Sequence, residues 1–101
     1  MGIELIGRDF GGMTIKEFQK LISERYEDTD RARGTPKTFL WFIEEVGELA
    51  TALNGSDREN LQEEFADVLA WLCTLANIND VDLSEAMEKK YLREEAEKEP
   101  K

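Results

Sequence analysis

The sequence predicts an all-α fold, a four-helix bundle of the up-and-down type that follows an irregular N-terminal arm. Apolar residues recur at intervals of three and four along most of the chain, which is the spacing of one face of a helix. Residues that favour helix N-termini stand before several of these stretches. No segment of useful length alternates apolar and polar residues as a half-buried strand does.

The N-terminal arm is expected over residues 1–13, which are rich in glycine and show no sustained helical period. A first helix is expected from residue 14 to about residue 27, because Thr14 and Glu17 have the spacing of a capping box. The charged residues that follow, 28–34, are expected to form a loop.

A second helix is expected to run to about residue 54. Thr35 is suited to cap it, and Pro36 suits its first turn because no backbone N–H is needed there. Gly55 is suited to end it.

A third helix is expected to follow at once and to run to about residue 79, because Ser56 and Glu59 again have capping-box spacing. The connection between the second and third helices is short, which predicts that they pack antiparallel. Asp82 and Glu85 predict a fourth helix, and residues 94–101 are expected to fray because nearly all of them are charged.

Composition excludes several classes of function. The chain has 101 residues, with 13 Lys and Arg against 23 Asp and Glu, and its net charge of −10 argues against general nucleic-acid binding and adhesion to anionic membranes. The absence of histidine excludes Ser-His and Cys-His nucleophiles, His-ligated zinc and Glu-x-x-His di-iron sites.

The expected location is the cytoplasm. The single cysteine, Cys73, lies in an apolar run, and a free buried thiol suits a reducing compartment. No apolar stretch is long enough for a signal peptide or a membrane-spanning helix.

Two pairs of acidic residues occupy corresponding faces of the second and third helices. On a helical wheel, Glu45 and Glu48 lie on one flank of the second helix, and Glu64 and Asp67 lie on the same flank of the third. Each pair has a tryptophan one turn away from one of its members. The core stripes expected beside them are Phe39, Phe42, Ile43, Val46, Ala50 and Leu53 in the second helix, and Leu61, Phe65, Val68, Leu72, Leu75 and Ala76 in the third.

Antiparallel packing would bring these four carboxylates together. Each close pair would then repel by up to about 4 kcal/mol at 4 Å and an effective dielectric constant of 20, which a divalent cation would relieve. Oxygen ligands without His or Cys indicate Mg²⁺, Mn²⁺ or Ca²⁺, and Mg²⁺ commonly joins protein carboxylates to substrate phosphates. The pattern therefore suggests metal-assisted hydrolysis of a phosphate ester or phosphoanhydride, and its alternative is an ordinary solvated acidic surface.

The same acids form two motifs on consecutive helices, E-E-x-x-E beginning at Glu44 and E-x-x-D beginning at Glu64. In this order they resemble the MazG-like branch of the all-α nucleoside triphosphate pyrophosphohydrolases. The likeness covers roughly residues 35–79 and extends weakly into the first helix.

The resemblance implies a single domain over residues 1–101, with its core at 14–93, that hydrolyses a nucleoside triphosphate to the monophosphate and pyrophosphate. The substrate is expected to be a deoxy or non-standard nucleotide, and the assembly a homodimer or homotetramer with its sites near the subunit interface. The resemblance also implies Mg²⁺ as the cofactor, with Mn²⁺ as an alternative. Its expected ligands are Glu45, Glu48, Glu64 and Asp67. Glu44 and Glu45 are the expected catalytic residues, and Glu44 either supports the metal ligands from behind or aids the attacking water.

Two other functions stay open. Phosphoribosyl-ATP pyrophosphohydrolase shares similar motifs, and residues 88–93 lack the asparagine that family members often carry in the helix after the motifs, so the substrate is not fixed. The alternative of another class is a non-catalytic helical module for dimerisation or nucleotide binding.

Five further residues are candidates for contact with the substrate. Trp41 and Trp71 are expected to stack on a nucleobase, and the alternative for each is packing at the core edge or at a subunit interface. Lys37, Lys90 and Arg93 are expected to meet the triphosphate, and the alternative for each is ordinary surface charge. Lys90 and Arg93 are the preferred pair because residues three apart share a helix face.

Overall fold

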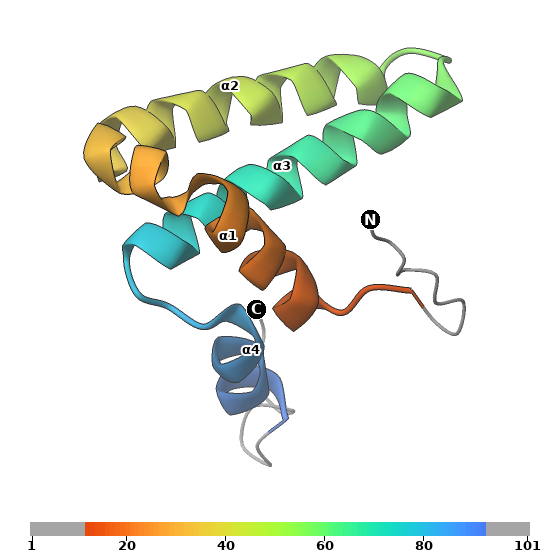
Figure 1. Ribbon diagram of the computed structural model, residues 1–101. Helices are drawn as coiled ribbons and strands as arrows, with labels where there is room; N and C mark the ends of the chain where they lie inside the picture. Colours follow the sequence, from red (N-terminus) through yellow and green to blue (C-terminus); the bar gives the residue numbers. More distant parts are fainter. Residues whose placement is uncertain (1–11, 93–101) are drawn as a thin grey trace.

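A computed structural model describes residues 12–92, which form four α-helices and no strand (Figure 1). The helices are α1 (Ile15–Arg33), α2 (Thr35–Leu53), α3 (Arg58–Ile78) and α4 (Leu83–Tyr91). Helices α2 and α3 lie side by side and antiparallel, α1 crosses α3, and the short α4 packs against α1. The all-α prediction is confirmed. None of the described helices is long and apolar enough to cross a membrane.

The first helix begins as predicted and ends later than predicted. The side chain of Thr14 accepts from the backbone N–H of Glu17, and the side chain of Glu17 accepts from the backbone N–H of Thr14, which completes the capping box. The loop expected over residues 28–34 was wrong, because α1 continues to Arg33. An ion pair of 2.7 Å between Asp30 and Arg33, one turn apart, lies on this added length, and Gly34 ends the helix with a φ of 90°.

The other helix ends agree in place, and the N-caps of α2 and α3 differ from the expected residues. Gly34, with no side chain to donate or accept, is the N-cap of α2, and the hydroxyl of Thr35 instead accepts a bond of 3.2 Å from Asn79. Asp57 caps α3 rather than Ser56, because its carboxylate accepts from the backbone N–H three residues later. Asp82 caps α4 as predicted.

The interior of the described chain is small, and the expected core stripe of α2 lies largely outside it. Residues buried below a tenth of their surface include Ile22, Ala52, Cys73 and Ala76. By contrast Phe39 is 49% exposed and Ile43 is 48% exposed. The helix is amphipathic as predicted, but the helices described in residues 12–92 cover only about half of each of these two side chains. The other exposed members of the two expected stripes are Val46, Ala50, Leu53, Phe65 and Leu72.

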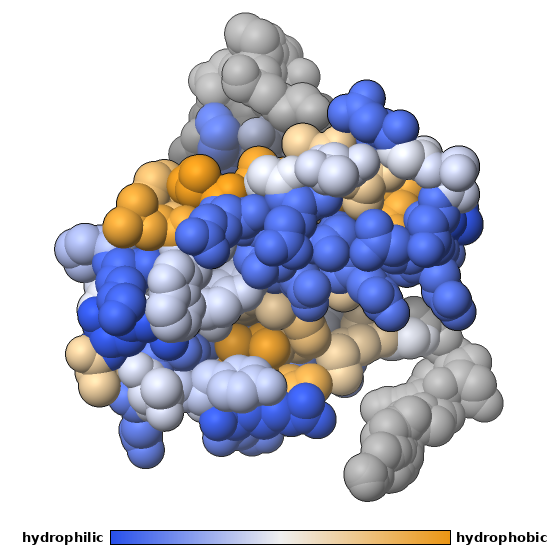
Figure 2. Space-filling model, turned by 90° about the horizontal axis from the view of Figure 1, so that it is seen from above, coloured by the Kyte–Doolittle hydropathy of each residue, from blue (hydrophilic) through white to orange (hydrophobic). Residues whose placement is uncertain are grey.

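These exposed side chains leave apolar surface on the folded chain. Figure 2 shows apolar areas on both sides of a hydrophilic band. Scattered apolar residues are normal on a protein surface, whereas a continuous helical stripe is typical of an interface.

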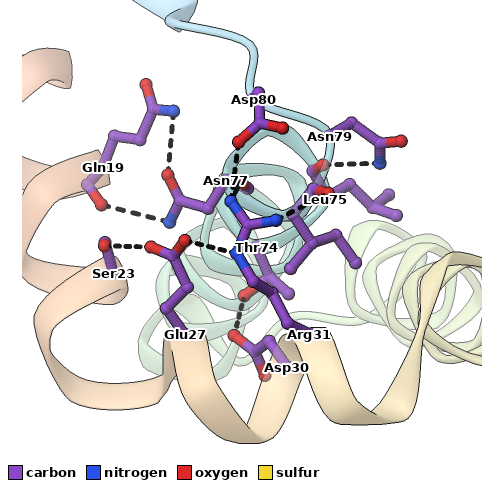
Figure 3. A network of polar contacts seen from close by, with 11 residues as sticks. Gln19, Ser23, Glu27, Asp30, Arg31, Thr74, Leu75, Asn77, Asn79 and Asp80 are labelled. Carbon is purple, nitrogen blue, oxygen red and sulfur yellow. Dashed lines mark hydrogen bonds and ion pairs between the residues drawn. The ribbon is translucent and has the colours of Figure 1, made fainter.

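A polar network fixes α1 against the end of α3 (Figure 3). Arg31 donates to the backbone carbonyl of Asn77 at 2.8 Å and pairs with Asp80 and Glu27 at 2.7 Å each. Gln19 and Asn77 exchange two further hydrogen bonds. The same carbonyl also accepts from the backbone N–H of Asp80 at 3.2 Å, so Arg31 adds a second bond there and ties α1 to the last turn of α3.

Candidate active site

Three glutamates from two helices meet on the paired α2 and α3. Glu45 and Glu48 are one turn apart on α2, and Glu64 reaches them from α3. Each offers a carboxylate oxygen, and these three oxygens all lie within 4.8 Å of one another. The antiparallel packing of α2 and α3 therefore brings together three of the four acids that the helical wheel selects.

The cluster is electrostatically strained. Partial burial, followed by the charges of Glu48, Asp67 and Glu64, raises the pKa of Glu45. Burial, followed by the charges of Glu48 and Asp67, raises the pKa of Glu64. In both residues the environment opposes the ionised form, which is the effect expected of desolvation and like charges at close range.

One oxygen of Glu64 lacks a partner as well. Its Oε1 atom is shielded from solvent and has no hydrogen-bond partner in the described part of the chain. A buried carboxylate oxygen without a partner costs free energy, and such atoms in folded proteins usually have a missing ligand or a function.

These residues fit a hard divalent cation. Mg²⁺ and Mn²⁺ take carboxylate oxygens, and a cation there would give the Glu64 oxygen a ligand and offset the repulsion within the cluster. The three glutamates supply oxygen donors alone, which does not suit zinc in its usual nitrogen and sulfur sites.

The remaining two predicted acids lie beside the cluster. Asp67 is outside the group of three oxygens, but its charge raises the pKa of both Glu45 and Glu64, and its side chain lines the cavity described next. Glu44 is exposed on α2 and makes a smaller contribution of the same sign to the pKa of Glu45.

A cavity of about 390 Å³ opens between α1 and α3 beside these acids. Asp67 and Trp71 line it from α3, and Tyr26 lines it from α1. It thus combines aromatic side chains with a carboxylate that belongs to the charged cluster. A pocket of this size is in the range that holds a small ligand.

The two tryptophans form one wall of aromatic rings. Trp41 and Trp71 meet edge to face, with ring centroids 5.5 Å apart. The guanidinium of Arg33 lies 4.9 Å from the ring of Trp41 and 5.1 Å from that of Trp71, and the ammonium of Lys37 lies 5.5 Å from Trp41. These cation–π contacts hold the rings in place. Of the two rings, Trp71 is the one that lines the cavity.

A buried ion pair lies at the inner wall of the cavity. Asp30, only 5% exposed, pairs with Arg33 at 2.7 Å and accepts from the hydroxyl of Thr74 at 3.2 Å. Arg33 also donates to the buried hydroxyl of Thr38 at 2.9 Å. Sequence reasoning missed Asp30 because it assigned residues 28–34 to a loop. The spacing of Asp30 and Arg33, one helical turn, was the available signal.

The other predicted contacts are less closely placed. Lys37 is over Trp41, whereas Lys90 lies on α4 with its ammonium 5.4 Å from the ring of Tyr91. Arg93 lies outside the described residues, so the predicted pair of Lys90 and Arg93 stays a prediction.

Comparison with known proteins gives one result that bears on the site. The family model described as the MazG nucleotide pyrophosphohydrolase domain matches residues 34–97, a range that contains both acidic motifs. No curated protein matches the chain.

Proposed function

Since the chain belongs to the family of MazG nucleotide pyrophosphohydrolase domains, we propose that it hydrolyses a nucleoside triphosphate to the nucleoside monophosphate and pyrophosphate, with Mg²⁺ as its cofactor. One observation carries the proposal. Three glutamate oxygens from α2 and α3 converge within 4.8 Å, and one of these glutamates, Glu64, has a buried oxygen without a partner.

The proposed metal ligands are Glu45, Glu48, Glu64 and Asp67. Bound there, Mg²⁺ would neutralise phosphate charge and lower the pKa of a coordinated water. The carboxylates lie on two rigid helices, and side chains on helices are positioned more precisely than side chains on loops. Glu44, exposed beside Glu45, is proposed to accept a proton from the attacking water.

The cavity beside Asp67 is the proposed site of the nucleoside. Asp67 faces both the cluster and the cavity, so a triphosphate at the carboxylates would place its sugar and base toward Trp71 and Tyr26. Base-on-aromatic stacking is worth about 1–3 kcal/mol for each base. Lys37, Lys90 and Arg93 are the proposed contacts for the phosphates, and Trp41 is proposed to support Trp71.

A second copy of the chain is proposed to cover the exposed apolar stripe. Phe39, Ile43 and Phe65 are about half exposed on α2 and α3, the same helices that carry the acidic cluster. Complete burial of such a side chain from full exposure is worth about 1.5–3 kcal/mol, so burial of the exposed half of each contributes about half of that. We propose a homodimer or homotetramer, in a reducing cytoplasm that suits the buried free thiol of Cys73.

The test is a panel of ribo- and deoxynucleoside triphosphates, with non-standard nucleotides and phosphoribosyl-ATP included, incubated with Mg²⁺ or Mn²⁺. Monophosphate and pyrophosphate in equal amounts are the expected products, separated by anion-exchange chromatography. Diphosphate and orthophosphate would show cleavage at the wrong bond. Selective hydrolysis of phosphoribosyl-ATP would assign the chain to that reaction instead.

The matched control is Glu48→Gln, which removes one charge from the cluster and keeps the shape of the side chain. Any hydrolysis that survives this change undiminished belongs to a contaminant or to another site. If the pure protein leaves every nucleotide intact with both metals, the proposed activity is wrong.

A further inference from the structure

Two groups of opposite hydrogen-bonding character stand next to each other on the cavity wall. Asp30 and Arg33 both line the cavity, and they are joined by an ion pair of 2.7 Å. Their side chains are among the least exposed charged groups of the described chain, at 7% and 11%. A buried ion pair offsets the desolvation of its two charges only when further hydrogen bonds complete it.

Neither group is saturated by the bonds described. A carboxylate offers about four acceptor positions, and Asp30 uses one on Oδ1 for Arg33 and one on Oδ2 for Thr74. A guanidinium offers five N–H donors, and the bonds of Arg33 to Thr38 and Asp30 start from Nε and Nη2. The cavity wall thus has a hydrogen-bond acceptor of Asp30 with unused positions directly beside unused N–H donors of Arg33.

This order of acceptor and donor matches one kind of nucleobase edge. Cytosine and adenine present an amino group beside an unprotonated ring nitrogen, so the amino group faces an acceptor and the ring nitrogen faces a donor. Uracil and hypoxanthine present the reverse, an oxo group beside a ring N–H. An oxo group against the Asp30 carboxylate would leave two acceptors in contact, which costs free energy in a site shielded from water.

We propose that Asp30 and Arg33 determine base specificity, and that the protein selects nucleotides whose base carries an amino group beside an unprotonated ring nitrogen on its Watson–Crick edge, as cytosine and adenine do. Asp30 accepts from the amino group, and Arg33 donates to the ring nitrogen. The Trp71 ring flanks the base plane from the adjacent wall. The proposal rests on the proposed function, because it places the base of the substrate in this cavity.

The first test compares two pairs of nucleotides that differ at this edge, CTP with UTP and ATP with ITP. A well-placed pair of hydrogen bonds discriminates between bases by about 1–3 kcal/mol, so the ratio of kcat/KM within each pair is expected to favour the amino base by about 5- to 150-fold. Ratios of one or below in both pairs would overturn the proposal while leaving the hydrolase activity established.

The second test assigns the preference to Asp30. Asp30→Asn replaces one carboxylate oxygen with an NH₂ donor, and we expect the CTP-to-UTP ratio to fall several-fold. Asp28→Asn, an exposed acid on the same helix, is the matched control and should keep the wild-type ratio. An unchanged ratio in a folded Asp30→Asn protein would overturn the assignment.

Asp30→Asn also weakens a buried ion pair, so the fold of this variant must be checked by circular dichroism. Thr74→Val is therefore used as a second variant. Loss of the Thr74 hydroxyl removes a bond that holds Oδ2 of Asp30, and we expect the ratio to fall here too. A Thr74→Val protein with the full wild-type ratio would count against Asp30.

A binding measurement separates this proposal from the proposed function. The α,β-methylene analogues of CTP and UTP resist cleavage at the relevant bond, so their affinities in the presence of Mg²⁺, measured by calorimetry, report base selection without turnover. Tighter binding of the cytosine analogue by a protein that hydrolyses no nucleotide would support the proposed base selection and contradict the hydrolase. Equal affinities of the two analogues for a protein that does hydrolyse nucleotides would contradict the proposed base selection and support the hydrolase.

Discussion

A carboxylate oxygen of Glu45 lies within 4.8 Å of one from Glu64, although the two residues belong to different helices and are both partly buried. The pKa of each is raised, first by burial and then by neighbouring carboxylates. Two ionised carboxylates at that distance destabilise the fold unless a cation lies between them. The cluster thus lowers the stability of the metal-free protein, as expected of the proposed metal site.

Removal of one charge should therefore stabilise the metal-free protein. We expect Glu64→Gln to raise the melting temperature by a few degrees in the presence of EDTA and to lose most of the rise that millimolar Mg²⁺ or Mn²⁺ gives the wild type. Differential scanning fluorimetry measures both. Glu63→Gln, exposed on the same helix, is the control and should keep the full response to metal. A wild type whose melting temperature does not rise with either metal would contradict the proposed metal site.

Catalysis should depend on the same cluster far more than stability does. We expect Glu48→Gln to lower kcat/KM by at least about 100-fold, because even groups that only support metal ligands typically cost 10- to 100-fold when removed. Glu59→Gln, an exposed acid in the first turn of α3, serves as the control and should remain active. Similar kcat/KM values for Glu48→Gln and the wild type would show that Glu48 takes no part in catalysis.

The metal-free protein should lose stability as the pH rises from the ordinary range of a glutamate pKa toward neutrality. Between the ordinary pKa and the raised pKa of Glu45 and Glu64, the folded state binds more protons than the unfolded state, so the free energy of unfolding falls with rising pH.

Urea titrations in EDTA at several pH values measure this slope. Glu64→Gln should flatten it, because one of the two responsible groups no longer titrates. The lowered pKa values of Glu27 and Asp82 act in the opposite direction and below the ordinary range, so they do not mask the effect. A free energy of unfolding that rises across this window would contradict the assignment.

The helical pattern was sufficient to predict the elements and the acidic face, and it failed where tertiary contacts decide. The i, i+3 spacing of Glu45 and Glu48 is a property of one helix, so sequence alone reveals it. The length of α1 was not predicted, because residues 28–34 carry no apolar stripe, and the one-turn spacing of Asp30 and Arg33 was the only sign of a helix there.

Burial was the other feature that the sequence failed to predict. Periodicity identifies Phe39 and Ile43 as apolar-face residues but cannot say whether that face meets the same chain or another one. The cavity also escaped prediction, because its walls join Tyr26 of α1 to Trp71 of α3 across a long sequence separation.

The exposed stripe should be where the proposed assembly forms. We expect Phe65→Glu to shift the protein toward the monomer mass in size-exclusion chromatography with light scattering, because a charge would then replace a side chain that is 54% exposed in the isolated chain. Leu92→Glu, on a more exposed apolar residue at the end of α4, is the control. A wild type that already elutes as a monomer at high micromolar concentration would contradict the assembly.

Cys73 should report on the integrity of the fold. It is fully buried on α3, and burial raises the pKa of its thiol, so both access and thiolate content are low in the folded state. We expect labelling by a thiol-specific disulfide reagent to be slow in buffer and fast in urea, with the labelling rate following the unfolding curve. Cys73→Ser should lower the free energy of unfolding by about 1–3 kcal/mol, since it buries a hydroxyl in place of a thiol. Cys73→Ala adds no polar group, so a serine variant as stable as the alanine variant would show that water reaches this position and that α3 is less tightly packed than its burial indicates.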